Sequence, residues 1–120
     1  MTQKELKEQY KQMKFKMGVF QIRNIANDKI YVDCSTNLDA IRNRNWTELN
    51  FGGHRSPELQ KDWNDAGEGN FVFEILAEVE PEDGKNTDYK KEINALLELY
   101  LEELQPFGDK GYNRPPKKSE

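Results

Sequence analysis

Residues 17–36, MGVFQIRNIANDKIYVDCST, decide how the rest of the chain folds. The first of two strands is predicted from Val19, Phe20, Ile22 and Ile25, and the second from Ile30, Tyr31 and Val32. Asn27 and Asp28 lie between these apolar runs, and both residue types tolerate the positive φ that hairpin turns require. The stretch therefore predicts a β-hairpin around which the other elements are arranged.

Capping residues and apolar spacing predict the remaining elements. Helices are expected over residues 3–13, over residues 38–50, from Pro57 to near Gly67, and over residues 88–105, with a well-buried strand over residues 70–76. Asn37 and Ser56 suit the N-cap positions of the second and third helices, because their side-chain oxygens accept an amide of the first turn. Residues 81–86 form a polar loop without a packing signal.

The element order α-β-β-α-α-β-α predicts a small domain of the α/β (α+β) class. We expect a three-stranded, mainly antiparallel sheet flanked by helices. A helical extension is expected over residues 1–16, the domain itself over residues 17–113, and a flexible tail over residues 114–120.

Length and composition limit the classes of protein that fit. The 120 residues suit one domain with a modest core. No apolar run is long enough to cross a bilayer, and the first residues do not form an apolar secretory segment. The single cysteine, Cys34, has no partner for an internal disulfide, which fits a reducing compartment. We therefore expect a cytoplasmic protein.

Charge is distributed unevenly along the chain. The net charge of −4 argues against a strong general nucleic-acid binder. Residues 1–23 nevertheless hold six basic side chains against two acidic ones, whereas residues 74–104 hold ten acidic side chains against three basic ones. One end of the chain can therefore approach phosphate, and the other repels it.

Two triplets in the hairpin, Gly18-Val19-Phe20 and Tyr31-Val32-Asp33, resemble the paired motif of the GIY-YIG nuclease superfamily. Further marks in the same order are Asn37-Leu38, Gly52-x-His54, Leu59-Gln60-x-x-Trp63-Asn64, Gly67-Glu68-x-Asn70-Phe71 and Gly111-Tyr112-Asn113. The resemblance covers roughly residues 17–113 and implies a GIY-YIG-like fold. It also implies an ancestral activity, the divalent-metal-dependent cleavage of DNA.

Three positions keep the residue types that the superfamily uses in catalysis: Tyr31, His54 and Asn113. The resemblance implies that Tyr31 helps to deprotonate water and hold phosphate, that His54 assists, and that Asn113 steadies the site. Each of the last two has a second interpretation. His54 suits an exposed or capping side chain in a glycine-rich loop, and Asn113 suits a turn residue that bonds its own backbone.

Four positions depart from the superfamily pattern. Phe20 replaces the first tyrosine, Asp33 a glycine, Ile41 the arginine and Leu97 the metal-binding glutamate. Arginine and metal neutralise the charge that builds on phosphate during cleavage, so their joint loss is expected to remove useful turnover. The neighbouring residues Arg42, Arg44 and Glu98 point in other directions on their helices, because each step turns the side chain by about 100°.

We interpret the chain as an endonuclease-like domain with a degraded active site, most simply a non-catalytic binding or regulatory module. It resembles a stand-alone degenerate branch whose members are found with bacterial transcription regulators. The partner is DNA, with Arg42, Arg44 and Arg55 as substrate-binding candidates, or a protein that contacts the acidic last helix. No metal ligand is assigned, and no cofactor is expected.

Two alternatives stay open at this point. The chain is a weak DNA endonuclease if Asp33 or Glu98 binds Mg²⁺ or Mn²⁺ and Arg42 or Arg44 reaches the phosphate. Otherwise it is a small α/β domain whose role the sequence does not encode. Trp46 and Trp63 are expected to be core or interface residues rather than base-stacking platforms.

Overall fold

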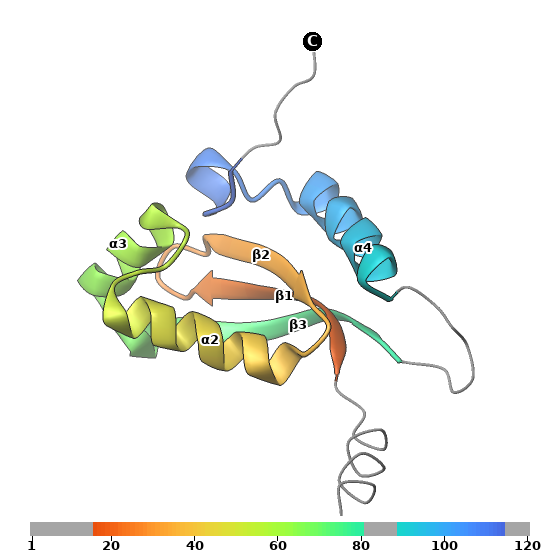
Figure 1. Ribbon diagram of the computed structural model, residues 1–120. Helices are drawn as coiled ribbons and strands as arrows, with labels where there is room; N and C mark the ends of the chain where they lie inside the picture. Colours follow the sequence, from red (N-terminus) through yellow and green to blue (C-terminus); the bar gives the residue numbers. More distant parts are fainter. Residues whose placement is uncertain (1–15, 81–88, 115–120) are drawn as a thin grey trace, which may run out of the picture.

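A computed structural model describes residues 16–80 and 89–114 (Figure 1). Its main elements are β1 (Met17–Asn24), β2 (Ile30–Ser35), α2 (Leu38–Phe51), α3 (Pro57–Ala66), β3 (Phe71–Val79) and α4 (Tyr89–Leu104). Short 3₁₀ turns, η1 (Glu68–Asn70) and η2 (Gly108–Lys110), precede β3 and follow α4. The predicted helix over residues 3–13 and the loop over residues 81–86 lie outside the described residues.

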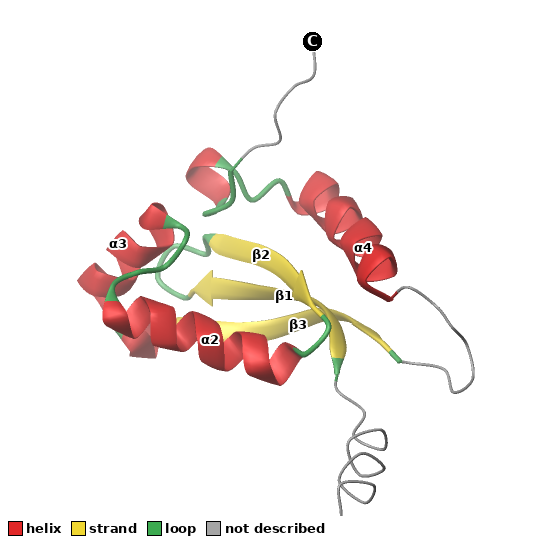
Figure 2. Ribbon diagram, in the orientation of Figure 1, coloured by secondary structure: helices red, strands yellow, loops and turns green. Residues whose placement is uncertain are grey.

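The three strands form one sheet in the order β2-β1-β3, and β1 is antiparallel to both neighbours. Figure 2 shows α2 and α3 on one side of the sheet and α4 on the other. The predicted α+β class and the antiparallel three-stranded sheet are therefore confirmed. No helix in the described part of the chain is both long and apolar enough to cross a membrane.

The hairpin that the sequence predicts is present, but its turn is wider than expected. β1 ends at Asn24 and β2 begins at Ile30, so Ile25 belongs to the loop, where it is 49% exposed. Asp28 adopts a positive φ of 60°, as its residue type allows, and Asn27 does not. Asn27 instead accepts a hydrogen bond from the Lys29 amide at 3.0 Å.

Gly18, in the first triplet, permits close contact between β1 and β3. Its φ is 153°, and a Cβ atom built on it would lie 1.9 Å from the carbonyl oxygen of Ala77. The strand register also shifts between Val19 and Phe20. Only glycine fits this crowded and conformationally restricted position.

The main core lies between the sheet and the α2–α3 layer. Phe20 and Ile22 are fully buried there, and the Phe20 ring stacks on Phe73 with ring centroids 4.8 Å apart. Trp46 and Trp63 meet edge to face at 5.5 Å, so both tryptophans are core residues as expected. Alternate strand residues face the opposite layer, where α4 contacts β1 and β2.

The burial of β3 and α4 is lower than their apolar patterns predicted. β3 is an edge strand with one neighbour, and in it only Phe71 is buried while Ile75 is 43% exposed. In α4 only Ile93 is buried, and Leu97 is half-buried, because no further layer covers the helix. The prediction of a well-buried third strand is therefore wrong.

The predicted helix caps are confirmed. The Asn37 side chain accepts a hydrogen bond from the Ala40 amide at 3.1 Å, and the Ser56 hydroxyl accepts one from the Leu59 amide at 3.3 Å. Gly52 ends α2 in the left-handed conformation with a φ of 82°. These caps fix where α2 ends and α3 begins, and so position the loop that carries His54 and Arg55.

Candidate functional site

The segment Gly111–Asn113 closes the domain by pairing with the free edge of β2. The Tyr112 amide donates to the Ile30 carbonyl at 2.9 Å. The Asn113 side chain accepts from the Val32 amide and donates to the Val32 carbonyl, each at 2.8 Å. The side chain thus satisfies the backbone amide and carbonyl of Val32, as a neighbouring strand would. The interpretation of Asn113 as a turn residue bonding its own backbone is therefore wrong.

Tyr112 anchors this segment to the rest of the domain. Its hydroxyl donates to an Asp62 carboxylate oxygen at 2.6 Å and accepts from the Asn24 side chain at 3.1 Å. Its carbonyl accepts from the Ser56 hydroxyl at 3.0 Å. Burial, together with the Asp62 carboxylate, raises the pKa of Tyr112 to about 12. Tyr112 therefore stays protonated and joins β1, α3 and the closing segment.

His54 is a buried structural histidine, 7% exposed. Its Nε2 lies 2.6 Å from Oδ1 of Asn45, whose Nδ2 donates to the Ile41 carbonyl, so Nε2 is the protonated nitrogen. Nδ1 accepts from the Ser56 amide at 3.0 Å. Both ring nitrogens are thus occupied, and burial lowers the pKa of His54 below 6.5. The interpretation of His54 as an exposed side chain is wrong.

The neutral state of His54 makes the stability of the domain depend on pH. Because its folded-state pKa lies below the ordinary value of 6.5, the unfolded chain binds more protons under acidic conditions. Its contribution is fully present above that value and is lost as the pH falls through it. We expect the free energy of unfolding, measured with urea and tryptophan fluorescence, to decrease between about pH 7.5 and about pH 5. His54→Gln should flatten this decrease, and an unchanged slope would assign the effect to other groups.

Tyr31 lies directly beside His54 and points its hydroxyl toward Asp33. The two rings meet edge to face with centroids 5.2 Å apart. The Tyr31 hydroxyl donates to Oδ2 of Asp33 at 3.4 Å, and Arg55 Nη1 lies 3.9 Å from the same oxygen. Burial first, and the charge of Asp33 second, raise the pKa of Tyr31 well above its ordinary value. At neutral pH Tyr31 therefore keeps its proton and donates a hydrogen bond to Asp33.

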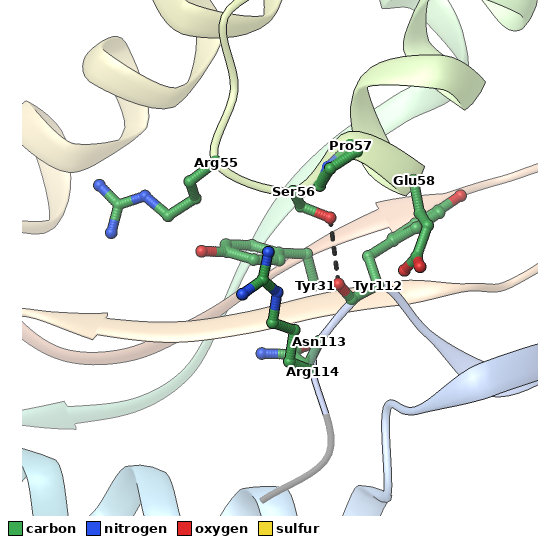
Figure 3. A pocket seen from close by; sticks show the side chains of 8 residues that line it. All are labelled: Tyr31, Arg55, Ser56, Pro57, Glu58, Tyr112, Asn113 and Arg114. Atoms are coloured by element: carbon green, nitrogen blue, oxygen red, sulfur yellow. Dashed lines mark hydrogen bonds between the residues drawn. The ribbon is translucent and has the colours of Figure 1, made fainter.

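A cleft of about 420 Å³ opens in front of Tyr31 (Figure 3). It is lined by Tyr31, Arg55, Ser56, Pro57, Glu58, Tyr112, Asn113 and Arg114. Arg55 and Arg114 come from segments far apart in the sequence and bring two guanidinium groups to one cleft. The prediction placed Arg114 in the flexible tail and missed its position in the wall of the cleft. Its position directly after Gly111-Tyr112-Asn113 was the available signal.

The structure brings together some of the predicted site residues and separates others. Tyr31, Asn113 and Arg55 line the cleft, and His54 packs under Tyr31. Arg42 instead lies over the Trp46 ring at 5.6 Å, and Arg44 pairs with Glu48 at 3.0 Å. Neither of these α2 arginines lines the cleft.

The donor groups present do not fit the divalent metal that the resemblance implies. Leu97, which the resemblance matches to the metal-binding glutamate, offers no oxygen, and Glu98 lines a neighbouring groove that shares Arg114 with the cleft. Within residues 16–80 and 89–114, no group of three or more His, Cys, Asp or Glu side chains is close enough to hold a metal ion.

Comparison with known proteins identifies relatives by sequence and by structure. No protein-family model matches the chain. Intron-associated endonuclease 1 of Enterobacteria phage T4 is 32% identical over 108 residues, which cover 85% of this chain and 43% of the relative. The chain thus spans less than half the length of that protein.

Two solved structures share the fold. The catalytic domain of intron endonuclease I-TevI, in a mutant form, superposes with a TM-score of 0.69 at 30% identity, covering 82% of this chain and 93% of that one. A second structure of the catalytic domain of homing endonuclease I-TevI gives a TM-score of 0.69 at 28% identity, covering 83% and 99%. Together with the paired triplets on β1 and β2, these similarities show that the chain belongs to the GIY-YIG nuclease superfamily.

Proposed function

We propose that this domain is a non-catalytic binding module that holds the phosphate backbone of DNA in the cleft formed by Tyr31, Arg55 and Arg114. The main support is that the superfamily fold is retained while apolar side chains stand at two positions that are charged in the superfamily pattern. Ile41 packs against the core and Leu97 is half-buried in α4, at the two positions where the superfamily pattern has arginine and the metal-binding glutamate. Two arginines, Arg55 and Arg114, line the cleft.

The remaining groups suit binding better than hydrolysis. Cleavage needs a base for water and a charge-neutralising group on the phosphate. Tyr31 keeps its proton, and both nitrogens of His54 are engaged in hydrogen bonds. Neither side chain is therefore available to accept a proton from water.

The cleft offers donors that match a phosphate group. Guanidinium groups present several N–H donors in a planar fork, whereas the single proton of the Tyr31 hydroxyl is already donated to Asp33. The carboxylates of Asp33 and Glu58 weaken the attraction of the cleft for an anion. Oδ2 of Asp33 lies 3.9 Å from Nη1 of Arg55, and Glu58 lines the cleft. We therefore propose moderate affinity that depends on two phosphate contacts, in keeping with a protein of net charge −4.

Two phosphate contacts give a definite salt dependence. The logarithm of the association constant for duplex DNA should fall with the logarithm of the salt concentration with a slope of about −1.8. Arg55→Ala or Arg114→Ala should each weaken binding and reduce the slope by about 0.9. Lys90→Ala, which removes one positive charge from the exposed first turn of α4, should change neither value. Fluorescence anisotropy with a labelled duplex measures both quantities. Absence of binding at low salt would contradict the proposal.

The same protein tests the loss of catalysis. Plasmid DNA incubated with an excess of the domain and with Mg²⁺ or Mn²⁺ should remain uncut. Cleavage that Tyr31→Phe abolishes would instead identify a working nuclease, with Asp33 as the carboxylate nearest to Tyr31.

A further inference from the structure

Phe51 is an aromatic side chain presented to solvent at the end of α2. It is 86% exposed, the highest value among the large hydrophobic side chains in the described part of the chain. The backbone beside it is held in place, because the Gly53 amide donates to the Glu48 carbonyl at 2.9 Å and Gly52 caps the helix. Cβ atoms built on Gly52 and Gly53 would meet no atom within 4 Å, so the backbone that follows Phe51 is also open.

Phe51 shares one face of α2 with Glu48. Helical spacing of three and four places Arg44, Glu48 and Phe51 along one face of the helix. Glu48 on this face is close enough to Tyr31 and His54 for its charge to act on both rings. The ring is thus one helical turn beyond a residue that neighbours the cleft.

A groove adjoins the cleft, and the residue that follows Phe51 lines it. The groove is lined by Gly52, His54, Pro57 and Lys61 among others, and it shares Pro57 with the cleft. Gly52 directly follows Phe51, and Lys61 adds a cation with no ion pair among the described residues. Arg55 and Lys61 therefore lie in two hollows that share Pro57, together with the carboxylates of Glu58 and Asp65, and Phe51 directly precedes Gly52 in the wall of the second.

We propose that Phe51 is a base-stacking platform and that the domain prefers single-stranded DNA to duplex DNA. This inference rests on the proposed function, because the phosphates must first be held by Arg55 and Arg114. A base in a duplex has both faces covered by its neighbours, whereas an unpaired base can stack on an exposed ring. Stacking of this kind tolerates any sequence because every base presents a π face.

The test compares labelled oligonucleotides of equal length: a single strand with bases, a single strand of abasic sugar phosphates, and a duplex. Anisotropy should show the first bound about 10-fold more tightly than the second. Phe51→Ala should remove this difference and leave affinity for the abasic strand unchanged, whereas Phe51→Trp should retain it. Leu99→Ala, which removes another exposed apolar side chain, should have no effect.

The outcomes separate this inference from the proposed function. Equal binding of the wild-type protein to the strand with bases and the abasic strand overturns the stacking role, while binding to phosphate stands. Tighter binding to the duplex than to the single strand also overturns it. Failure to bind any of the three oligonucleotides overturns the proposed function itself. The comparison of the three oligonucleotides uses only the wild-type protein. A folding defect in a variant therefore does not affect its interpretation.

Discussion

Gly18→Ala is expected to lower the free energy of unfolding by about 3 kcal/mol or more, a large share of the stability of an ordinary domain. The new Cβ would lie 1.9 Å from the Ala77 carbonyl oxygen, which belongs to the backbone of β3 and cannot rotate away. The φ of 153° adds strain, because residues with a Cβ rarely adopt it. The strands must therefore separate where β1 pairs with Glu78. Urea unfolding followed by tryptophan fluorescence measures the loss.

Gly53→Ala is the matched control. A Cβ atom at Gly53 meets nothing within 4 Å, and its φ lies outside the left-handed region. We expect a change within about 0.5 kcal/mol, which is typical of surface substitutions. Similar losses in the two variants would contradict the explanation based on contact between β1 and β3.

Asn113→Ala is expected to cost about 2–4 kcal/mol of stability. The substitution removes both hydrogen bonds to Val32 and leaves an amide and a carbonyl at the edge of β2 without these partners. Asn113→Asp should be at least as harmful at neutral pH, because a carboxylate cannot donate to the Val32 carbonyl and repels it. Denaturant unfolding of both variants gives the two values.

A second asparagine supplies the control for this prediction. The Asn27 side chain accepts one hydrogen bond in the exposed hairpin loop, so Asn27→Ala should cost no more than about 1 kcal/mol. Because Arg114 follows Asn113 directly, Asn113→Ala should also weaken DNA binding at salt concentrations where the variant is folded. Full stability of Asn113→Ala would show that water replaces the lost contacts.

Local sequence chemistry predicted the elements that depend on neighbouring residues. The Asn37 and Ser56 caps and the glycine after α2 act within a few residues, so their types alone indicate where helices begin and end. The two triplets lie within one hairpin, so they indicated both the superfamily and the antiparallel pairing of β1 with β2. These features need no knowledge of the tertiary arrangement.

Burial and long-range hydrogen bonds were not predictable in this way. His54 follows two glycines, which suggested exposure, but Asn45 and Ser56 enclose its ring. Asn113 bonds a residue 81 positions away, and nothing in its own segment indicates that partner. The apolar alternation of β3 did not reveal that the strand lies at the edge of the sheet.

The cleft is lined by residues of β2, by residues of the loop and first turn of α3, and by residues 112–114. These parts of the chain are synthesised at different times. Asn113 and Arg114 are synthesised long after Val32, and until they dock, β2 lacks its outer partner and the cleft lacks one cation. A nascent chain that has reached only α4 therefore has all three strands but lacks one of the two arginines that the proposed DNA binding uses. The same residues that complete the edge of β2 therefore also complete the proposed binding cleft.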